Sequence, residues 1–175
     1  MRTLSTAAAT LLLLAATPAL AASVNIPVNA IDASGVGQPI GSIEARDTRQ
    51  GLALTPKLSG LPAGPHGIHV HQNGDCGAKE QDGKPVAGLA AGGHYDPHGS
   101  GKHLGPWQTG GHMGDLPALA VTADGTATET LVAPHLKVAD LKGRAIVIHA
   151  GADNYADEPK PLGGGGARIA CGVVK

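Results

Sequence analysis

The sequence predicts an all-β protein, folded as an antiparallel sandwich or flattened barrel with two long loops on one side. Most of its apolar stretches alternate with a period of two, and beyond the N-terminal segment none has the pattern of a convincing amphipathic helix. The chain has no Phe and only 2% aromatic residues, beside 27 Gly and 13 Pro. A core of Val, Ile, Leu and Ala favours closely packed sheets, and the Gly and Pro content indicates many turns.

Strands are expected where the alternation is clearest: residues 24–30, 52–54, 68–70 and 119–123. The last of these leads into Asp124-Gly125, a two-residue hairpin signal with Thr-rich sequence returning. These segments define the first part of the sheet.

The C-terminal part adds a β-branched run over residues 144–149 and a final strand that ends near residues 172–174. Residues 138–142 fit one short helical turn. Residues 74–114 and 151–166 are rich in Gly, Pro, Asp and Asn and are expected to be long, functional loops, because loops of this length in a compact domain usually carry function.

Residues 1–21 have the pattern of a secretory signal peptide. Arg2 provides the positive start, residues 7–16 the apolar stretch, and Ala19-Leu20-Ala21 the cleavage site. The apolar run is too short for a membrane span and no second one follows, so we expect no membrane anchor. Residues 22–175 are expected to form a single domain in the periplasm.

Charge and cysteine content narrow the possible partners. With 13 Lys and Arg against 14 Asp and Glu, the chain has no basic patch that would indicate nucleic-acid binding. Two cysteines in an exported chain, Cys76 and Cys171, most simply form a disulfide. The alternatives are two free thiols or two metal ligands.

Histidines at strand spacing suggest a first metal site. His69 and His71 lie two residues apart and share one face of a strand, while Ile68 and Val70 take the core face. His149, at the end of the 144–149 strand, is a candidate third ligand. Taken alone, these residues also fit an exposed polar face. His66 falls with the core-facing residues and is expected to be a hydrogen-bonded structural histidine.

A second site is expected in the first long loop, where three histidines precede an aspartate. Three imidazoles and one carboxylate form a closed tetrahedral shell, which is typical of structural zinc. The alternative is a His-rich surface loop. His98 is expected to be exposed, and His135 has no assigned role. The four candidate ligands are His94, His103, His112 and Asp115.

With these residues in view, the chain resembles the copper,zinc superoxide dismutases of the bacterial periplasmic type. The resemblance covers nearly all of the sequence after residue 21, in the order of the family's motifs. These motifs are Gly64-Pro65-His66-Gly67-Ile68-His69-Val70-His71, Gly93-His94-Tyr95-Asp96-Pro97, Gly111-His112-Met113-Gly114-Asp115, Ile146-Val147-Ile148-His149-Ala150-Gly151-Ala152-Asp153 and Gly163-Gly164-Gly165-Gly166-Ala167-Arg168-Ile169-Ala170-Cys171.

The resemblance implies an eight-stranded Greek-key barrel, one copper and one zinc per chain, and a disulfide between Cys76 and Cys171. It implies that Asp153 accepts hydrogen bonds from one ligand of each metal and that Arg168 attracts the anionic substrate. It implies two ligand sets: copper on His69, His71, His94 and His149, and zinc on His94, His103, His112 and Asp115, with His94 shared.

The implied activity is conversion of superoxide to dioxygen and hydrogen peroxide by copper redox cycling, with a proton supplied through His94. A copper or zinc storage protein and a zinc hydrolase are the competing interpretations. Storage proteins usually use Met clusters, and Met113 is the only Met after residue 1. A homodimer is left open, since Trp107 fits either a subunit contact or a cover for the underside of its loop.

Overall fold

The structure, a computed structural model, describes residues 21–175, which form eleven strands and three short 3-10 helices. The strands are β1 Ser23–Asp32, β2 Gly35–Thr48, β3 Gly51–Leu58, β4 Gly64–His66, β5 Ile68–His71, β6 Lys79–Gln81, β7 Lys84–Val86, β8 Leu119–Val121, β9 Leu131–Ala133, β10 Ala145–His149 and β11 Arg168–Val173. The 3-10 helices are η1 Leu89–Ala91, η2 Val138–Leu141 and η3 Leu162–Gly164.

Seven of the strands form one curved antiparallel sheet in the order β5-β10-β11-β1-β2-β3-β9. The remaining strands form two separate pairs, β4–β8 and β6–β7. The expected all-β antiparallel class is confirmed. The expected strands do not all join one sheet. Strands β4 and β8 are only three residues long, and they hydrogen-bond to each other rather than to the large sheet.

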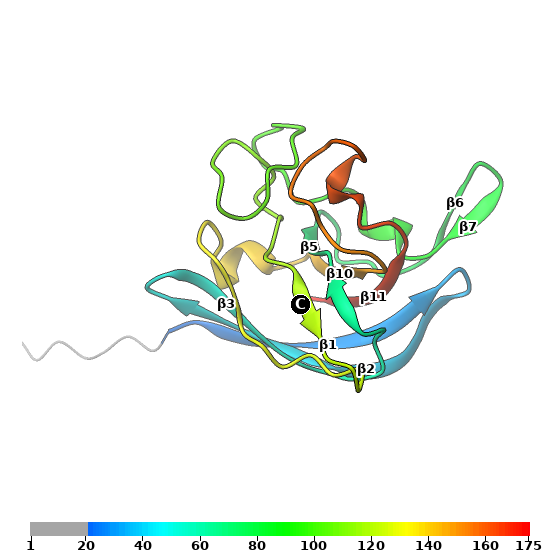
Figure 1. Ribbon diagram of the computed structural model, residues 1–175, viewed down its shortest axis with the longest axis horizontal. Coiled ribbons are helices and arrows are strands. Elements are labelled where there is room, and N and C mark those ends of the chain that lie inside the picture. The colour runs from blue at the N-terminus through cyan, green and yellow to red at the C-terminus, as the bar shows by residue number, and fades with distance from the viewer. Residues whose placement is uncertain (1–20) are drawn as a thin grey trace, which may run out of the picture.

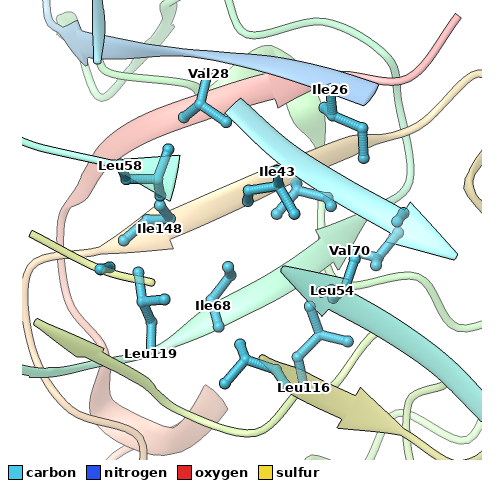
Figure 2. Close-up of a cluster of buried hydrophobic side chains, with 14 of the residues drawn as sticks. Ile26, Val28, Ile43, Leu54, Leu58, Ile68, Val70, Leu116, Leu119 and Ile148 are labelled. Atoms are coloured by element: carbon cyan, nitrogen blue, oxygen red, sulfur yellow. The ribbon is translucent and has the colours of Figure 1, made fainter. Parts of the chain in front are cut away.

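The main core lies between the large sheet and the β4–β8 pair (Figure 2). Its buried side chains are all aliphatic, and the partly buried Tyr95 and Met113 pack against it. The predicted alternation holds: Ile26 and Val28 of β1 and Ile68 and Val70 of β5 are all at most 1% exposed. Burying each such side chain contributes about 1.5–3 kcal/mol to folding.

A second, smaller cluster covers the other face of β10, where Ala145 and Val147 pack near Ile31. It contains the disulfide between Cys76 and Cys171, which closes a loop with a sequence separation of 95. The bond ties the start of the first long loop to β11, next to the strands that carry the histidines.

Removing this disulfide is expected to lower stability without changing the sheet. The Cys76→Ser/Cys171→Ser double variant should lose about 2–5 kcal/mol of unfolding free energy, because its unfolded chain is no longer constrained. Urea denaturation of both proteins in the same metal-loaded state measures the difference. A variant with the midpoint of the wild type would contradict the expectation.

The local structure agrees with the sequence expectations in two places and departs from them in two others. The turn predicted at residues 138–142 is η2. The Asp124-Gly125 turn forms, with Gly125 at a φ of 81° donating to the Thr122 carbonyl at 2.9 Å. The returning segment, however, bridges from Ala127 to Leu58 of β3 instead of forming a strand against β8. The β6–β7 hairpin within the first long loop was not predicted.

In the part of the chain that the structure describes, every helix is too short to cross a membrane. The signal peptide expected over residues 1–21 falls, apart from Ala21, outside the described residues.

Candidate metal centre

Strands β5 and β10 position three histidines side by side. The two strands are antiparallel neighbours with His69 opposite Val147 and His71 opposite Ala145, and His149 ends β10. Because successive side chains alternate, the histidines face away from the main core. His69 and His71 are nevertheless 0% exposed. The alternative of an exposed polar face is therefore wrong, since the long loops cover this side of the sheet (Figure 1).

The first long loop is docked onto the edge of β5 by backbone contacts. The Val70 amide donates to the Gly114 carbonyl at 2.8 Å, and the Tyr95 amide donates to the Val70 carbonyl at 2.8 Å. The approach is so close that a Cβ at position 114 would lie 2.2 Å from the Val70 carbonyl oxygen. Only glycine fits there, and this close approach places His94 and Asp115 beside the β5 histidines.

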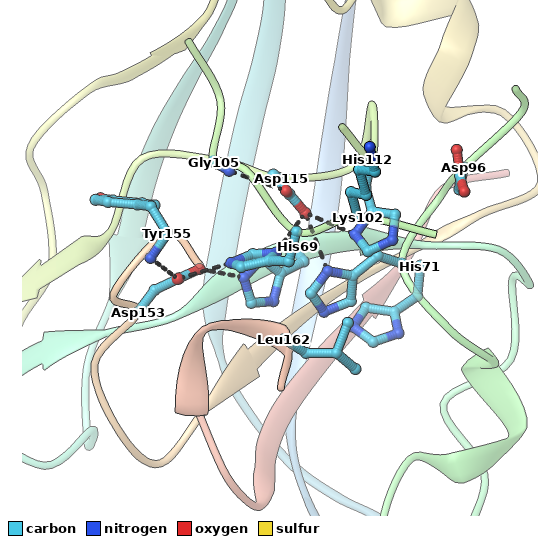
Figure 3. Close-up of polar contacts among 12 residues, drawn as sticks. His69, His71, Asp96, Lys102, Gly105, His112, Asp115, Asp153, Tyr155 and Leu162 are labelled. Carbon is cyan, nitrogen blue, oxygen red and sulfur yellow. Dashed lines mark hydrogen bonds and ion pairs between the residues drawn. The ribbon is translucent and has the colours of Figure 1, made fainter. Parts of the chain in front are cut away.

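The docked loop completes two groups of four ligands, within each of which one ligand atom per residue lies no more than 4.8 Å from the others. His94 belongs to both groups. Figure 3 shows His69, His71 and His112 gathered in one place, with Asp115 and Asp153 beside them. The four-histidine group is His69, His71, His94 and His149, and the mixed group is His94, His103, His112 and Asp115.

In the mixed group three ring nitrogens surround one carboxylate oxygen. Asp115 Oδ1 lies 3.0 Å from Nδ1 of His94, 3.0 Å from Nδ1 of His103 and 3.5 Å from Nδ1 of His112. The Nδ1 atoms of His103 and His112 are buried and make no hydrogen bond. Four donor atoms thus converge on one point, as a tetrahedral zinc site needs.

In two rings of the four-histidine group, one nitrogen faces a backbone carbonyl and the other has no hydrogen-bond partner. His71 Nδ1 is 2.9 Å from the Gly92 carbonyl, and His149 Nδ1 is 3.1 Å from the Gly166 carbonyl. Carbonyl oxygens only accept, so these nitrogens carry the protons and Nε2 is left with a lone pair. Both Nε2 atoms are buried without a hydrogen-bond partner. Buried lone pairs of this kind fit a bound cation.

Asp153 contacts one ring in each group. Its Oδ2 accepts from His69 Nε2 at 2.6 Å, which leaves His69 Nδ1 buried and unpaired. Its Oδ1 accepts from His103 Nε2 at 2.8 Å and from the Tyr155 amide at 2.7 Å. A Cβ at Gly163 would lie 2.0 Å from this oxygen, so glycine is required at that position as well.

Burial controls the ionisation of the histidines in the four-histidine group. Loss of solvent lowers the pKa of His69 to about 3 and that of His149 to about 4, and it holds the pKa of His71 well below its usual value. These rings are therefore neutral near pH 7, which is the form that binds metal.

The mixed group is more strongly polarised. Burial alone would lower the pKa of His103, but the carboxylates of Asp115 and Asp153 on either side of its ring outweigh it and raise the pKa to about 9. Burial alone would raise the pKa values of both carboxyl groups, but their contacts with the ring nitrogens hold them well below their usual range. Two buried negative charges therefore face these rings, which favours a divalent cation between them.

Arg168 begins β11 and is held beside the four-histidine group. Its guanidinium donates to the Gly88 carbonyl at 2.5 Å and to the Gly92 carbonyl at 2.7 Å. The Gly92 oxygen also accepts from His71, so cation and ring share one acceptor. In the β10–β11 ladder Arg168 is the partner of His149.

His66 and His98 lie as the sequence suggested, and His135 had no assigned role. His66 is 2% exposed, with its ring nitrogens 2.7 Å from the His149 carbonyl and 2.8 Å from the Pro62 carbonyl, and it belongs to neither group. His98 and His135 are exposed. The orienting carbonyls of Gly92 and Gly166 were missed, because a backbone acceptor has no signature in the sequence.

The antiparallel β fold carries two metal-ligand groups that share one imidazole, that of His94. This arrangement places the protein in the class of dinuclear metalloproteins. Residues 40–174 match the family described as Copper/zinc superoxide dismutase (SODC). The chain is 54% identical over 151 residues to "Superoxide dismutase [Cu-Zn]" of Pasteurella multocida, covering 86% of this chain and 81% of that protein. It is 52% identical over 176 residues to "Superoxide dismutase [Cu-Zn] 2" of Salmonella typhimurium, covering 100% of both.

Solved structures agree. The Cu/Zn superoxide dismutase from Brucella abortus matches with a TM-score of 0.86 and 48% identity, covering 88% of this chain and 100% of that one. The monomeric copper, zinc superoxide dismutase from Salmonella enterica matches with a TM-score of 0.79 and 53% identity, again over 88% and 100%.

The chain therefore belongs to the copper/zinc superoxide dismutase family. It is an enzyme that converts superoxide to dioxygen and hydrogen peroxide, and its cofactors are copper and zinc. The family membership excludes the interpretations as a metal-storage protein and as a zinc hydrolase.

Proposed function

We propose that the four-histidine group binds the catalytic copper, that the mixed group binds a structural zinc, and that His94 bridges the two ions. The observation that carries the proposal is the membership of His94 in both groups. Its Nδ1 faces Asp115 in the mixed group, which leaves Nε2 for the four-histidine group.

The donor chemistry supports this division. Four imidazoles suit Cu²⁺, whereas three imidazoles and one carboxylate suit zinc. Bound copper supplies the electron exchange with superoxide. His94 Nε2 is the atom at which the chain can hold a proton for the reduced substrate, because Nδ1 stays with the mixed group. Asp153 keeps the rings of His69 and His103 in the tautomer that binds metal.

Arg168 is proposed to attract and orient superoxide. The substrate is a small anion, and the guanidinium is a fixed positive charge beside the copper group. Its two hydrogen bonds to carbonyl oxygens leave the charge uncompensated by any carboxylate among its hydrogen-bond partners. Such a charge raises the rate of encounter more than the strength of binding.

Metal analysis with a superoxide-quenching assay tests the copper and zinc assignment. One copper and one zinc per chain with high activity is the expected result. Replacing zinc with Co²⁺ tests the bridge, because a shared imidazolate couples the two electron spins and should broaden or abolish the copper EPR signal. A full, uncoupled copper signal would contradict the role of His94.

We propose that residues 22–175 are the mature domain and that it acts in the periplasm. The predicted leader, the disulfide and the bacterial relatives support this. Mass spectrometry of the protein from a periplasmic extract should give a chain that begins at Ala22. Recovery of the intact chain from the cytoplasmic fraction would refute the proposal.

We also propose a homodimer in which Trp107 lies at the subunit contact. Its side chain is 60% exposed and rests edge-on against Tyr155, with ring centroids 5.1 Å apart. Large aromatic residues are enriched at such contacts. Sedimentation at micromolar concentration should show a dimer for the wild type and a monomer for Trp107→Gln. A wild type that is already monomeric would reject the proposal.

A further inference from the structure

A cavity of about 410 Å³ opens beside the zinc half of the metal centre. Its lining includes the buried Asp115 and the mostly buried His112, and also the exposed His98 and His135. The cavity therefore connects solvent with two of the proposed zinc ligands. His69, His71 and His149 are absent from its lining, so it serves the zinc half alone.

The cavity is lined by the two histidines that have no other assigned role. Of the nine histidines in the sequence, six form the metal groups, and His66 lies between two carbonyl oxygens. The remaining two, His98 and His135, both line this one cavity. They come from separate segments, the first long loop and the turn after β9, so the fold rather than sequence proximity places both on this cavity.

The cavity also offers the right side chains for a weak metal site. Imidazole is a preferred ligand of zinc, and two exposed imidazoles leave the other coordination positions to water. Ser100 lines the same space and adds a hydroxyl oxygen. Such a site binds and releases zinc rapidly, whereas the buried mixed group, closed by four protein ligands, exchanges slowly.

We propose that His98 and His135 form an additional, exchangeable zinc site that captures the ion and passes it to His112. This inference depends on the proposed zinc role of His112. The transfer is a ligand exchange: both histidines of the capture site and the bound waters leave the ion as His112 and then the other three ligands bind. No electron moves.

Two measurements on the copper- and zinc-loaded enzyme test the capture site. Calorimetric titration with ZnCl₂ should detect one additional, weak equivalent in the wild type and none in the His98→Ala/His135→Ala variant. Incubation with ⁶⁷Zn²⁺, followed by mass spectrometry, should show exchange of the resident zinc slowed severalfold in that variant, because the ion then reaches His112 without first being captured. The Gln108→Ala/Thr109→Ala variant, altered in the same cavity without loss of a histidine, should behave as wild type.

Three results would overturn the proposal: no additional equivalent in the wild type, an unchanged exchange rate in the histidine variant, or loss of the resident zinc from that variant. The first two would leave the assignment of the resident zinc untouched. Failure of that assignment would appear separately, in the metal content and the EPR coupling of the wild type.

Discussion

The Arg168→Glu enzyme is expected to dismutate superoxide roughly 10- to 100-fold more slowly than the wild type while retaining copper and zinc. The guanidinium sits beside the proposed copper ligands and is held by two backbone carbonyls. A carboxylate at this position replaces an attractive charge with a repulsive one. The metal content should persist, because Arg168 belongs to neither ligand group.

Stopped-flow or pulse-radiolysis rates at several ionic strengths measure this effect. The wild-type rate should fall as salt rises, and the Arg168→Glu rate should rise, because screening weakens attraction in one and repulsion in the other. Arg168→Lys is the matched control. It keeps the charge but loses the two-pronged contact with Gly88 and Gly92, so its salt dependence should keep the sign of the wild type. Near-wild-type rates for Arg168→Glu at low salt would refute steering.

The sequence predicted the histidine-bearing strands well, because their side chains obey a simple period. The alternation that puts Ile68 and Val70 into the core fixes His69 and His71 on the opposite face, and β10 follows the same rule. What the period does not reveal is whether that opposite face is covered. Burial of His69 and His71 depends on a loop that docks through Gly114, a contact between backbones far apart in sequence.

The shared role of His94 also lay beyond residue-level reasoning. Spacing grouped His94 with His103, His112 and Asp115, but its membership of the four-histidine group came only from the family resemblance. In the structure that membership depends on an antiparallel backbone β-bridge between His71 and His94, which forms where the loop pairs with the edge of β5. The β6–β7 hairpin was missed for another reason: its polar, three-residue strands carry no apolar alternation.

The Asp153→Asn variant is expected to lose copper affinity more than zinc affinity. The Tyr155 amide donates to Oδ1 and will hold the single amide oxygen of Asn at that position, where it still accepts from His103. The NH₂ group then replaces Oδ2 and points at His69 Nε2, a proton donor. Two donors cannot pair, so His69 is driven to carry its proton on Nδ1, the atom proposed to bind copper.

Outer carboxylates of this kind alter metal affinity about 10- to 100-fold, and we expect copper to fall within that range while zinc changes less. Competition with chelators gives both affinities, and copper EPR should report the altered His69. Asp153→Ala, which frees both rings, should weaken both metals. Asp157→Asn is the control, because Asp157 accepts from the His103 backbone rather than from its ring. Equal losses of both metals in Asp153→Asn would show that the carboxylate acts through charge alone and not by fixing the tautomer of His69.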